Sequence, residues 1–186
     1  MRIISGKLKG RSIEFLKNIN TRPLKDSVKE NIFNILEHTK KINIKIENSN
    51  ILDLYSGIGS FGLEAISRGA KKVTFIDQNV DAINILKKNL DRFSITDKAK
   101  VLNEKIENFF RNVMNEKFDI FFFDPPFSDK AFTKFLNLAK NKKVFNSYHI
   151  IIIHREKKSN DNLKGLVRIL DIKIYGRSKI IFGQFL

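Results

Sequence analysis

A glycine-rich stretch carries the first chemical signal in this sequence. Residues 57–62 read Gly-Ile-Gly-Ser-Phe-Gly and follow an aliphatic run at 50–55 that predicts a strand. A Gly-x-Gly-x-x-Gly turn between a strand and a helix lets the backbone approach a nucleoside cofactor. Asp77 ends the next predicted strand, where its carboxylate can accept hydrogen bonds from ribose hydroxyls. In this context the stretch predicts a cofactor site and not a plain strand-to-helix turn.

The kind of cofactor follows from Asp53, four residues before the first glycine. A dinucleotide would place its pyrophosphate over this loop and the next helix N-terminus, where a carboxylate adds repulsion. S-adenosylmethionine has no phosphate, and an acid at the end of the first strand suits its cationic sulfonium and amino groups. The sequence therefore favours S-adenosylmethionine over NAD. The candidate cofactor-binding residues are Asp53, Tyr55, Ser56, Gly57, Gly59, Asp77 and Gln78.

A second motif, Asp-Pro-Pro-Phe, ends the Phe-rich run that begins at residue 121. Proline restricts φ and carries no N–H, so the backbone here is rigid and its carbonyls are free to accept. The carboxylate of Asp124 and the carbonyl of Pro125 can accept the two hydrogens of an exocyclic amine while Phe127 stacks on the ring. The candidate catalytic residues are Asp124, Pro125, Pro126 and Phe127.

Such an amine is a poor nucleophile because its lone pair is delocalised into the ring. Aspartate, with a reference pKa of about 3.9, is too weak a base to deprotonate it first. Orientation must therefore supply most of the catalysis, and aligned reactants can gain roughly 7–11 kcal/mol. The proton leaves after methylation, to Asp124 or to water. The chain has no cysteine, which excludes the thiolate attack used in pyrimidine C5 methylation.

The elements that would position these motifs alternate along the chain. Hydrophobic patterns predict strands at 50–55, 72–77, 100–103, 119–124, 149–153, 167–175 and 179–185, and helices at 26–38, 61–68, 79–92, 105–114 and 129–140. We therefore expect an α/β, Rossmann-like fold with a doubly wound, mostly parallel sheet. A strand order of 3-2-1-4-5 would bring the loops after Asp53 and Asp124 into one crevice. The short turn near Gly176 indicates that one of the last two strands is antiparallel.

The charge of the chain points to a polyanionic partner. Its 186 residues carry 35 Lys and Arg against 20 Asp and Glu, a formal net charge of +15. Nucleic acid is the first candidate, although some lysines could simply be solvated surface residues. The N-terminal region, a hairpin around Gly6 and Gly10 followed by a helix, is especially basic. The candidate nucleic-acid-binding residues are Arg2, Lys7, Lys9, Arg11, Arg22, Lys25 and Lys29.

Five stretches resemble the bacterial 16S ribosomal RNA guanine-N2 methyltransferases of the RsmD type, which modify guanine 966. They are MRIISGKLKGRSI at the start, TRPLKDSVKENIFNIL at 21–36, the loop region 51–77, DPPF at 124–127 and YGRSKIIF at 175–182. The resemblance covers nearly the whole chain, and all three prolines lie within these stretches.

This resemblance implies a class I methyltransferase fold of seven strands, the last antiparallel, after a small hairpin and helix extension. It implies a basic RNA-side extension at 1–40 and an S-adenosylmethionine-dependent domain at 41–186. The substrate would be guanine N2 in 16S rRNA, in the 30S subunit or in an assembly intermediate. Leu24 and Ser27 stand where the family usually has Thr and Arg. Near the adenine the family has Asp-Ala, and here Glu104 is the candidate contact.

Other features of the sequence support no additional site. His38, His149 and His154 are scattered and have no carboxylate at ligand spacing, so we expect structural roles and no metal. We expect a cytoplasmic monomer without a membrane segment. The alternatives are an adenine-N6 methyltransferase acting on DNA or RNA, a non-enzymatic RNA-binding domain, and, least favoured, an NAD oxidoreductase.

Overall fold

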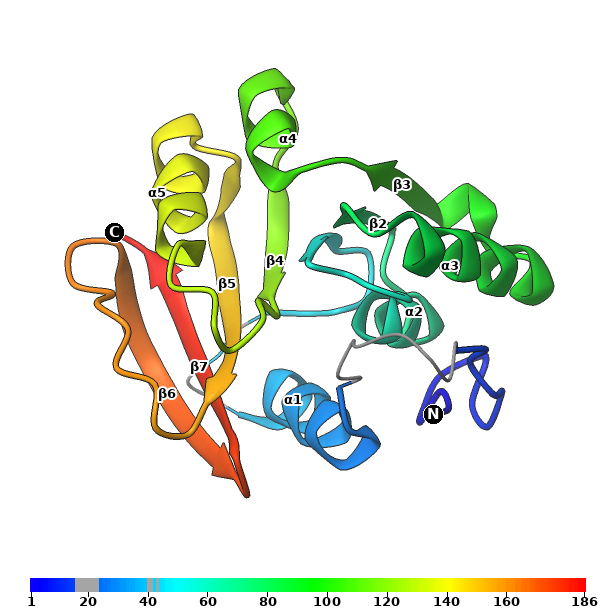
Figure 1. The fold of residues 1–186 in the computed structure, drawn as a ribbon. Helices are drawn as coiled ribbons and strands as arrows, with labels where there is room; N and C mark the ends of the chain where they lie inside the picture. The colour runs from blue at the N-terminus through cyan, green and yellow to red at the C-terminus, as the bar shows by residue number, and fades with distance from the viewer. Residues whose placement is uncertain (16–23, 40–41, 43) are drawn as a thin grey trace.

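The computed structural model describes residues 1–15, 24–39, 42 and 44–186, and one sheet runs through it (Figure 1). In this part of the chain seven strands lie in the order β3-β2-β1-β4-β5-β7-β6. They are β1 Asn50–Leu54, β2 Lys72–Asp77, β3 Ala99–Asn103, β4 Phe118–Phe123, β5 Phe145–Glu156, β6 Val167–Tyr175 and β7 Ser178–Phe185. β1 to β5 pair in parallel, and β7 pairs antiparallel with β5 and β6. The predicted fold class, the order 3-2-1-4-5 and the antiparallel last strand are confirmed.

Helices cover both faces of the sheet. They are α1 Asp26–His38, α2 Ser60–Ser67, α3 Val80–Phe93, α4 Ile106–Asn112 and α5 Phe132–Lys142, with a 3-10 turn at Thr96–Lys98. One buried cluster joins α1, α2 and α3 to the sheet, and a second joins α4 and α5 to the opposite face (Figure 1). Alternate strand residues serve the two clusters, as in β4, where Phe122 belongs to the first and Phe121 and Phe123 to the second. No helix in the described part of the chain has both the length and the apolar character needed to cross a bilayer.

The boundaries of β4 and β5 differ from the predicted ones. β4 ends at Phe123, so Asp124 is the first residue beyond the strand. β5 begins at Phe145, earlier than the predicted 149, because Phe145 pairs with Phe118 on the far side of a register shift. The polar residues between Phe145 and the isoleucine run conceal this extension from a hydrophobicity pattern.

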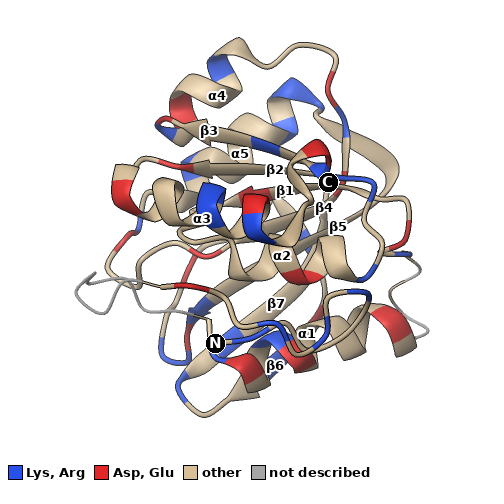
Figure 2. Ribbon diagram, turned by 90° about the vertical axis from the view of Figure 1, so that its right-hand side faces the viewer, with Lys and Arg blue, Asp and Glu red and all other residues tan. Residues whose placement is uncertain are grey.

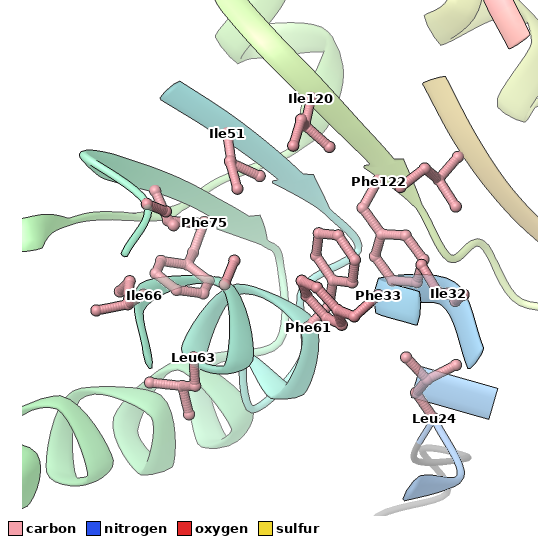
Figure 3. Packing of buried hydrophobic residues seen from close by; sticks show 14 of the residues in the cluster. Leu24, Ile32, Phe33, Ile51, Phe61, Leu63, Ile66, Phe75, Ile120 and Phe122 are labelled. Atoms are coloured by element: carbon pink, nitrogen blue, oxygen red, sulfur yellow. The ribbon is translucent and has the colours of Figure 1, made fainter. Parts of the chain in front are cut away.

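A stack of three phenylalanine rings ties the elements around the site together. The ring of Phe61, at the start of α2, lies 4.1 Å from that of Phe122 in β4 and 5.0 Å from that of Phe33 in α1 (Figure 3). Stacked aromatic pairs add about 0.5–1.5 kcal/mol each beyond their buried area. The helix that follows the glycine loop is therefore packed directly against the strand that leads into Asp-Pro-Pro-Phe.

The N-terminal segment is anchored on α2 by a buried carboxylate. The Glu64 side chain accepts hydrogen bonds from the backbone N–H groups of Ile4 (2.7 Å) and Ser5 (2.9 Å). The predicted hairpin is present as one antiparallel bridge between Arg2 and Ser12. Ile3 and Ile13 join the same buried cluster as α2. The division into units 1–40 and 41–186 stays a prediction.

Lys29 was wrongly predicted to contact nucleic acid. Its side chain is 0% exposed, and its Nζ donates to the backbone oxygen of Arg2 at 2.8 Å. Nζ also lies 3.7 Å from Glu64 and 3.6 Å from Asp26. Burial lowers the pKa of Lys29, and the two carboxylates oppose that shift. An ammonium enclosed in this way fastens α1 to the N-terminal segment and cannot reach a phosphate.

Candidate active site

A cavity of about 660 Å³ opens at the carboxyl ends of β1, β2, β4 and β5. Both motifs contribute to its wall, as the strand order requires. The predicted site residues that line it are Asp53, Tyr55, Ser56, Gly57, Asp77, Gln78, Glu104, Asp124, Pro125, Pro126 and Phe127. Gly59 does not line it. Gly59 precedes α2 with φ 80°, and a Cβ there would meet Leu86 Cδ1 at 2.5 Å, so its place in the structure is a tightly packed turn.

Asp77 shapes the glycine loop from the neighbouring strand. Its Oδ2 accepts the backbone N–H of Gly57 at 2.7 Å, and its Oδ1 accepts that of Asn79 at 2.8 Å. Gly57 has φ 53° and Tyr55 has φ 58°, so the loop turns through left-handed conformations as it leaves β1. Each Asp77 oxygen keeps a further lone pair for a ligand hydroxyl.

Asp53 is the most unusual group in the cavity wall. It is 1% exposed, and its Oδ2 accepts the backbone N–H of Gly62 at 3.0 Å. Its Oδ1 is buried and has no hydrogen-bond partner among the described residues. Burial raises the pKa of Asp53 well above its ordinary value; the Gly62 bond opposes the shift, and the charges of Asp124 and Asp77 add to it. A cation bound beside Oδ1 would relieve this cost.

The cavity is acidic although the protein is basic. Among the described residues, its wall carries six carboxyl side chains and one lysine, Lys105, against a net charge of +15 for the whole sequence. The six are Asp53, Asp77, Glu104, Glu107, Asp124 and Asp129. Such a wall attracts a cationic ligand and repels a pyrophosphate. The described residues contain no group of three or more His, Cys, Asp or Glu side chains that could hold a metal ion.

The loop 124–129 is held so that two of its acceptors stay unused. Arg155 donates to the backbone oxygens of Pro126 (3.0 Å), Phe127 (3.4 Å) and Asp129 (2.9 Å). The Oδ1 atom of Asp124 lies 2.8 Å from Nδ1 of His154. Among the described residues, neither Asp124 Oδ2 nor the Pro125 carbonyl oxygen has a hydrogen-bond partner. These two oxygens are the pair predicted to hold an amine.

Sequence reasoning missed the contribution of β5. His154 was predicted to be structural, yet it lines the cavity and contacts Asp124. Arg155, 1% exposed, was not singled out, yet it pairs with Asp161 at 3.0 Å and lies over the ring of Phe132. The available signal was the pair His154-Arg155 directly after four isoleucines. This pattern is not part of a recognised sequence motif.

Tyr55 and Asp129 link the glycine loop to the acceptor loop. The Tyr55 hydroxyl donates to Asp129 Oδ2 at 2.9 Å. Burial raises the pKa of Tyr55, and the Asp129 carboxylate raises it further. The phenol therefore stays protonated and remains a donor, which fixes the two loops relative to each other across the cavity.

The predicted basic residues that the structure describes do not line the cavity. Figure 2 shows Lys and Arg in the N-terminal segment and in β6 and β7. Arg2, Lys7, Lys9, Arg11 and Lys25 are exposed. Arg22 lies outside the described residues. Lys157, Lys158 and Arg177, which were not predicted, are exposed at the carboxyl end of β5 and the β6–β7 turn, at the same edge of the sheet as Asp124.

Comparisons with known proteins find a matching family model, and relatives and a solved structure that are named as methyltransferases. A family model described as "Conserved hypothetical protein 95" matches residues 1–184. The "Ribosomal RNA small subunit methyltransferase D" of Haemophilus influenzae is 35% identical over 159 residues, covering 84% of this chain and 79% of that protein. Its namesake in Buchnera aphidicola (subsp. Acyrthosiphon pisum) is 34% identical over 158 residues, covering 85% and 79%. A solved structure described as "Putative methyltransferase yhhF from Escherichia coli" has a TM-score of 0.84 at 26% identity, covering 100% of this chain and 97% of that one.

Proposed function

This chain belongs to the family described as Conserved hypothetical protein 95, as its motifs predicted, and from this premise we propose that it is an S-adenosylmethionine-dependent methyltransferase of 16S rRNA. The specific reaction we propose is methylation of a guanine N2 amine. One observation carries the proposal: an acidic cavity with an unpartnered buried carboxylate oxygen adjoins a rigid loop with two unused acceptors.

The residues present fit S-adenosylmethionine better than a phosphate-bearing cofactor. Asp53 Oδ1 and Ser56 Oγ are both buried without a partner in the described structure, and both residues line the cavity. The carboxylate suits a cationic group, and the hydroxyl can donate to or accept from a polar one. Asp77 is placed for ribose hydroxyls and Glu104 for the adenine side. When bound, S-adenosylmethionine supplies a methyl group activated by its sulfonium.

The acceptor loop supplies orientation. Asp124 Oδ2 and the Pro125 carbonyl oxygen accept the two amine hydrogens, which leaves the nitrogen lone pair to point into the cavity. Phe127 stacks on the base, and Pro126 keeps the backbone rigid. Once the nitrogen is methylated it becomes acidic, and Asp124 or water receives the released proton. Alignment of this kind can be worth roughly 7–11 kcal/mol of barrier.

RNA would meet the protein along the basic edges around the cavity. The exposed residues Arg2, Lys7, Lys9, Arg11 and Lys25 on one side, and Lys157, Lys158 and Arg177 on the other, can contact phosphates. The contrast between a basic exterior and an acidic cavity matches a polyanionic substrate and a cationic cofactor. The choice of guanine rests on the family, because the loop's two acceptors would hold any exocyclic amine.

Methylation of defined RNAs tests the proposal. The protein is incubated with methyl-labelled S-adenosylmethionine and either 16S rRNA or 30S subunits lacking the family's modification, and the nucleosides are identified by mass spectrometry. We expect N2-methylguanosine, at one position. Detection of N6-methyladenosine instead would show that the target base is adenine and not guanine. It would still agree with methylation of an exocyclic amine. Cofactor binding without methyl transfer to either 16S rRNA or 30S subunits would contradict an rRNA methyltransferase.

A further inference from the structure

His154 makes a hydrogen bond at each ring nitrogen. Its Nδ1 lies 2.8 Å from Asp124 Oδ1, and its Nε2 lies 2.9 Å from Ser178 Oγ. The contact with Asp124 follows from strand register: Phe123 pairs with Ile153, so the next residues on the two chains are neighbours. The imidazole is 6% exposed, which confines it to this arrangement.

The partners determine which nitrogen of the neutral ring carries the proton. An ionised carboxylate only accepts hydrogen bonds, so Nδ1 must be the donor to Asp124. Nε2 then accepts, and the Ser178 hydroxyl donates to it. Ser178 is 3% exposed and lies at the start of β7, which places it on a rigid strand. The carboxylate thus selects the tautomer, and the Ser178 hydroxyl, which can donate or accept, completes the hydrogen bonds of the ring.

The same ring contacts the aromatic member of the acceptor motif. The Phe127 ring lies 5.5 Å from His154 between centroids, at an interplanar angle of 80°. One imidazole therefore touches both the carboxylate and the ring that are proposed to bind the acceptor base. It binds Oδ1, and Oδ2 is the Asp124 oxygen that has no hydrogen-bond partner among the described residues.

We propose that His154 is a positioning residue for methyl transfer, holding the Asp124 carboxylate and the Phe127 ring in the orientation that receives the amine, with Ser178 fixing the imidazole. This inference rests on the proposed function. It assigns a positioning role in the reaction to the hydrogen-bonded series Ser178–His154–Asp124.

The hydrogen-bonded series Ser178–His154–Asp124 has the order of a hydrolase triad. Its surroundings exclude nucleophilic catalysis by the serine. A nucleophilic hydroxyl must reach the substrate. Ser178 is buried and does not line the cavity, whereas Asp124 and His154 do. Of the three hydrogen-bonded side chains, the Asp124 carboxylate therefore faces the cavity, and Ser178 lies in the protein interior.

Three variants of the full-length protein test the proposal: His154→Leu, His154→Asn and Ser178→Ala. Leucine removes the donor to Asp124, whereas the asparagine amide restores an N–H at the position of Nδ1. We expect His154→Leu to lower the single-turnover methylation rate about 10- to 100-fold, the loss typical of a small misalignment. His154→Asn should recover most of it, and Ser178→Ala should lie between them. The dissociation constant for S-adenosylmethionine, measured by calorimetry, should stay unchanged in all three.

Two controls separate positioning from folding. Thermal unfolding checks that each variant is folded, and ¹⁵N side-chain shifts of the wild type report whether Nδ1 of His154 carries the proton. A folded His154→Leu variant with the wild-type rate, an asparagine variant no better than leucine, or an Nδ1 that carries no proton would each overturn the proposal. A wild type inactive on rRNA overturns the proposed function and this inference together, whereas an active wild type isolates the outcome to His154.

Discussion

Asp124 and Asp77 have different partners, so their substitutions should separate the two halves of the site. Asp124→Ala removes one of the two acceptors that align the amine and should lower the methylation rate about 10²-fold or more, the loss expected from a misplaced reactant. Cofactor affinity should change little. Asp77→Ala should instead weaken cofactor binding, because it frees the N–H groups of Gly57 and Asn79.

Single-turnover rates and calorimetric dissociation constants check this pair of predictions. Asp97→Ala is a matched control, since Asp97 is exposed on the 3-10 turn Thr96–Lys98. If Asp124→Ala kept the wild-type rate, the proposed role of the carboxylate would be wrong.

Asp53 should make the cofactor-free protein sensitive to pH. Its pKa is raised by burial in the folded state, whereas the unfolded carboxyl ionises near its reference value of about 3.9. Its contribution to stability is therefore present below the unfolded pKa and is lost as pH rises toward the folded pKa. Asp53→Asn cannot ionise, so its melting temperature relative to the wild type should increase between about pH 4 and pH 7.

Thermal unfolding of the two proteins across this pH range, without cofactor, measures the difference. The same variant should bind S-adenosylmethionine more weakly at neutral pH, because a neutral amide cannot balance a sulfonium. A difference in melting temperature between variant and wild type that stays constant across this pH range would contradict a raised pKa of Asp53.

At the scale of elements, the end of β5 holds the acceptor loop from both faces of the sheet. Neighbouring strand residues point to opposite faces, and His154 and Arg155 use this alternation to hold the carboxylate and the backbone of one loop. Arg155→Gln leaves the Asp161 carboxylate, which is 9% exposed, without its partner and the loop carbonyls without their donor. We expect a loss of about 3–5 kcal/mol in unfolding free energy, typical of breaking a buried ion pair, together with slower methylation.

Asp161→Asn separates the two effects of Arg155. It removes the charge of the pair but leaves the three bonds from Arg155 to the loop. Stability should therefore fall while the methylation rate stays close to that of the wild type. Denaturant unfolding and single-turnover rates measure both quantities, and equal rate losses in the two variants would argue against a role for the loop bonds.

For the whole molecule, the position of a charge should matter more than its number. Lys157 and Lys158 follow β5 at the edge that carries Asp124, whereas Lys142 and Lys143 precede β5 at the opposite edge, and all four are exposed. Changing either pair to Gln removes two positive charges. Only the Lys157/Lys158 double variant should weaken RNA binding, and its slope of log K against log salt should flatten by about 1 to 2 if each lysine contacts a phosphate.

Binding titrations at several salt concentrations compare the two double variants. Equal losses would indicate that RNA responds to net charge alone and that the edge beside the acceptor loop is not a contact surface.

The fold and the family could be predicted from the sequence because their determinants are local or repeated along the chain. Strands and helices alternate with clear periodicity, and the glycine loop and Asp-Pro-Pro-Phe each occur within a few consecutive residues. The predicted strand order puts Asp53, Asp77 and Asp124 at one edge of the sheet, and the cavity wall contains all three.

Tertiary structure decided the features that depend on register and burial. His154 meets Asp124 across 30 positions of sequence because β4 and β5 pair at Phe123 and Ile153. Lys29 looks like its basic neighbours in the sequence, yet helix packing encloses it. Periodicity assigns a residue to a face, whereas the register of pairing and the depth of packing come from long-range contacts that no short stretch encodes. The sequence by itself therefore determined the motifs, and the folded chain determined which side chains hold them in place.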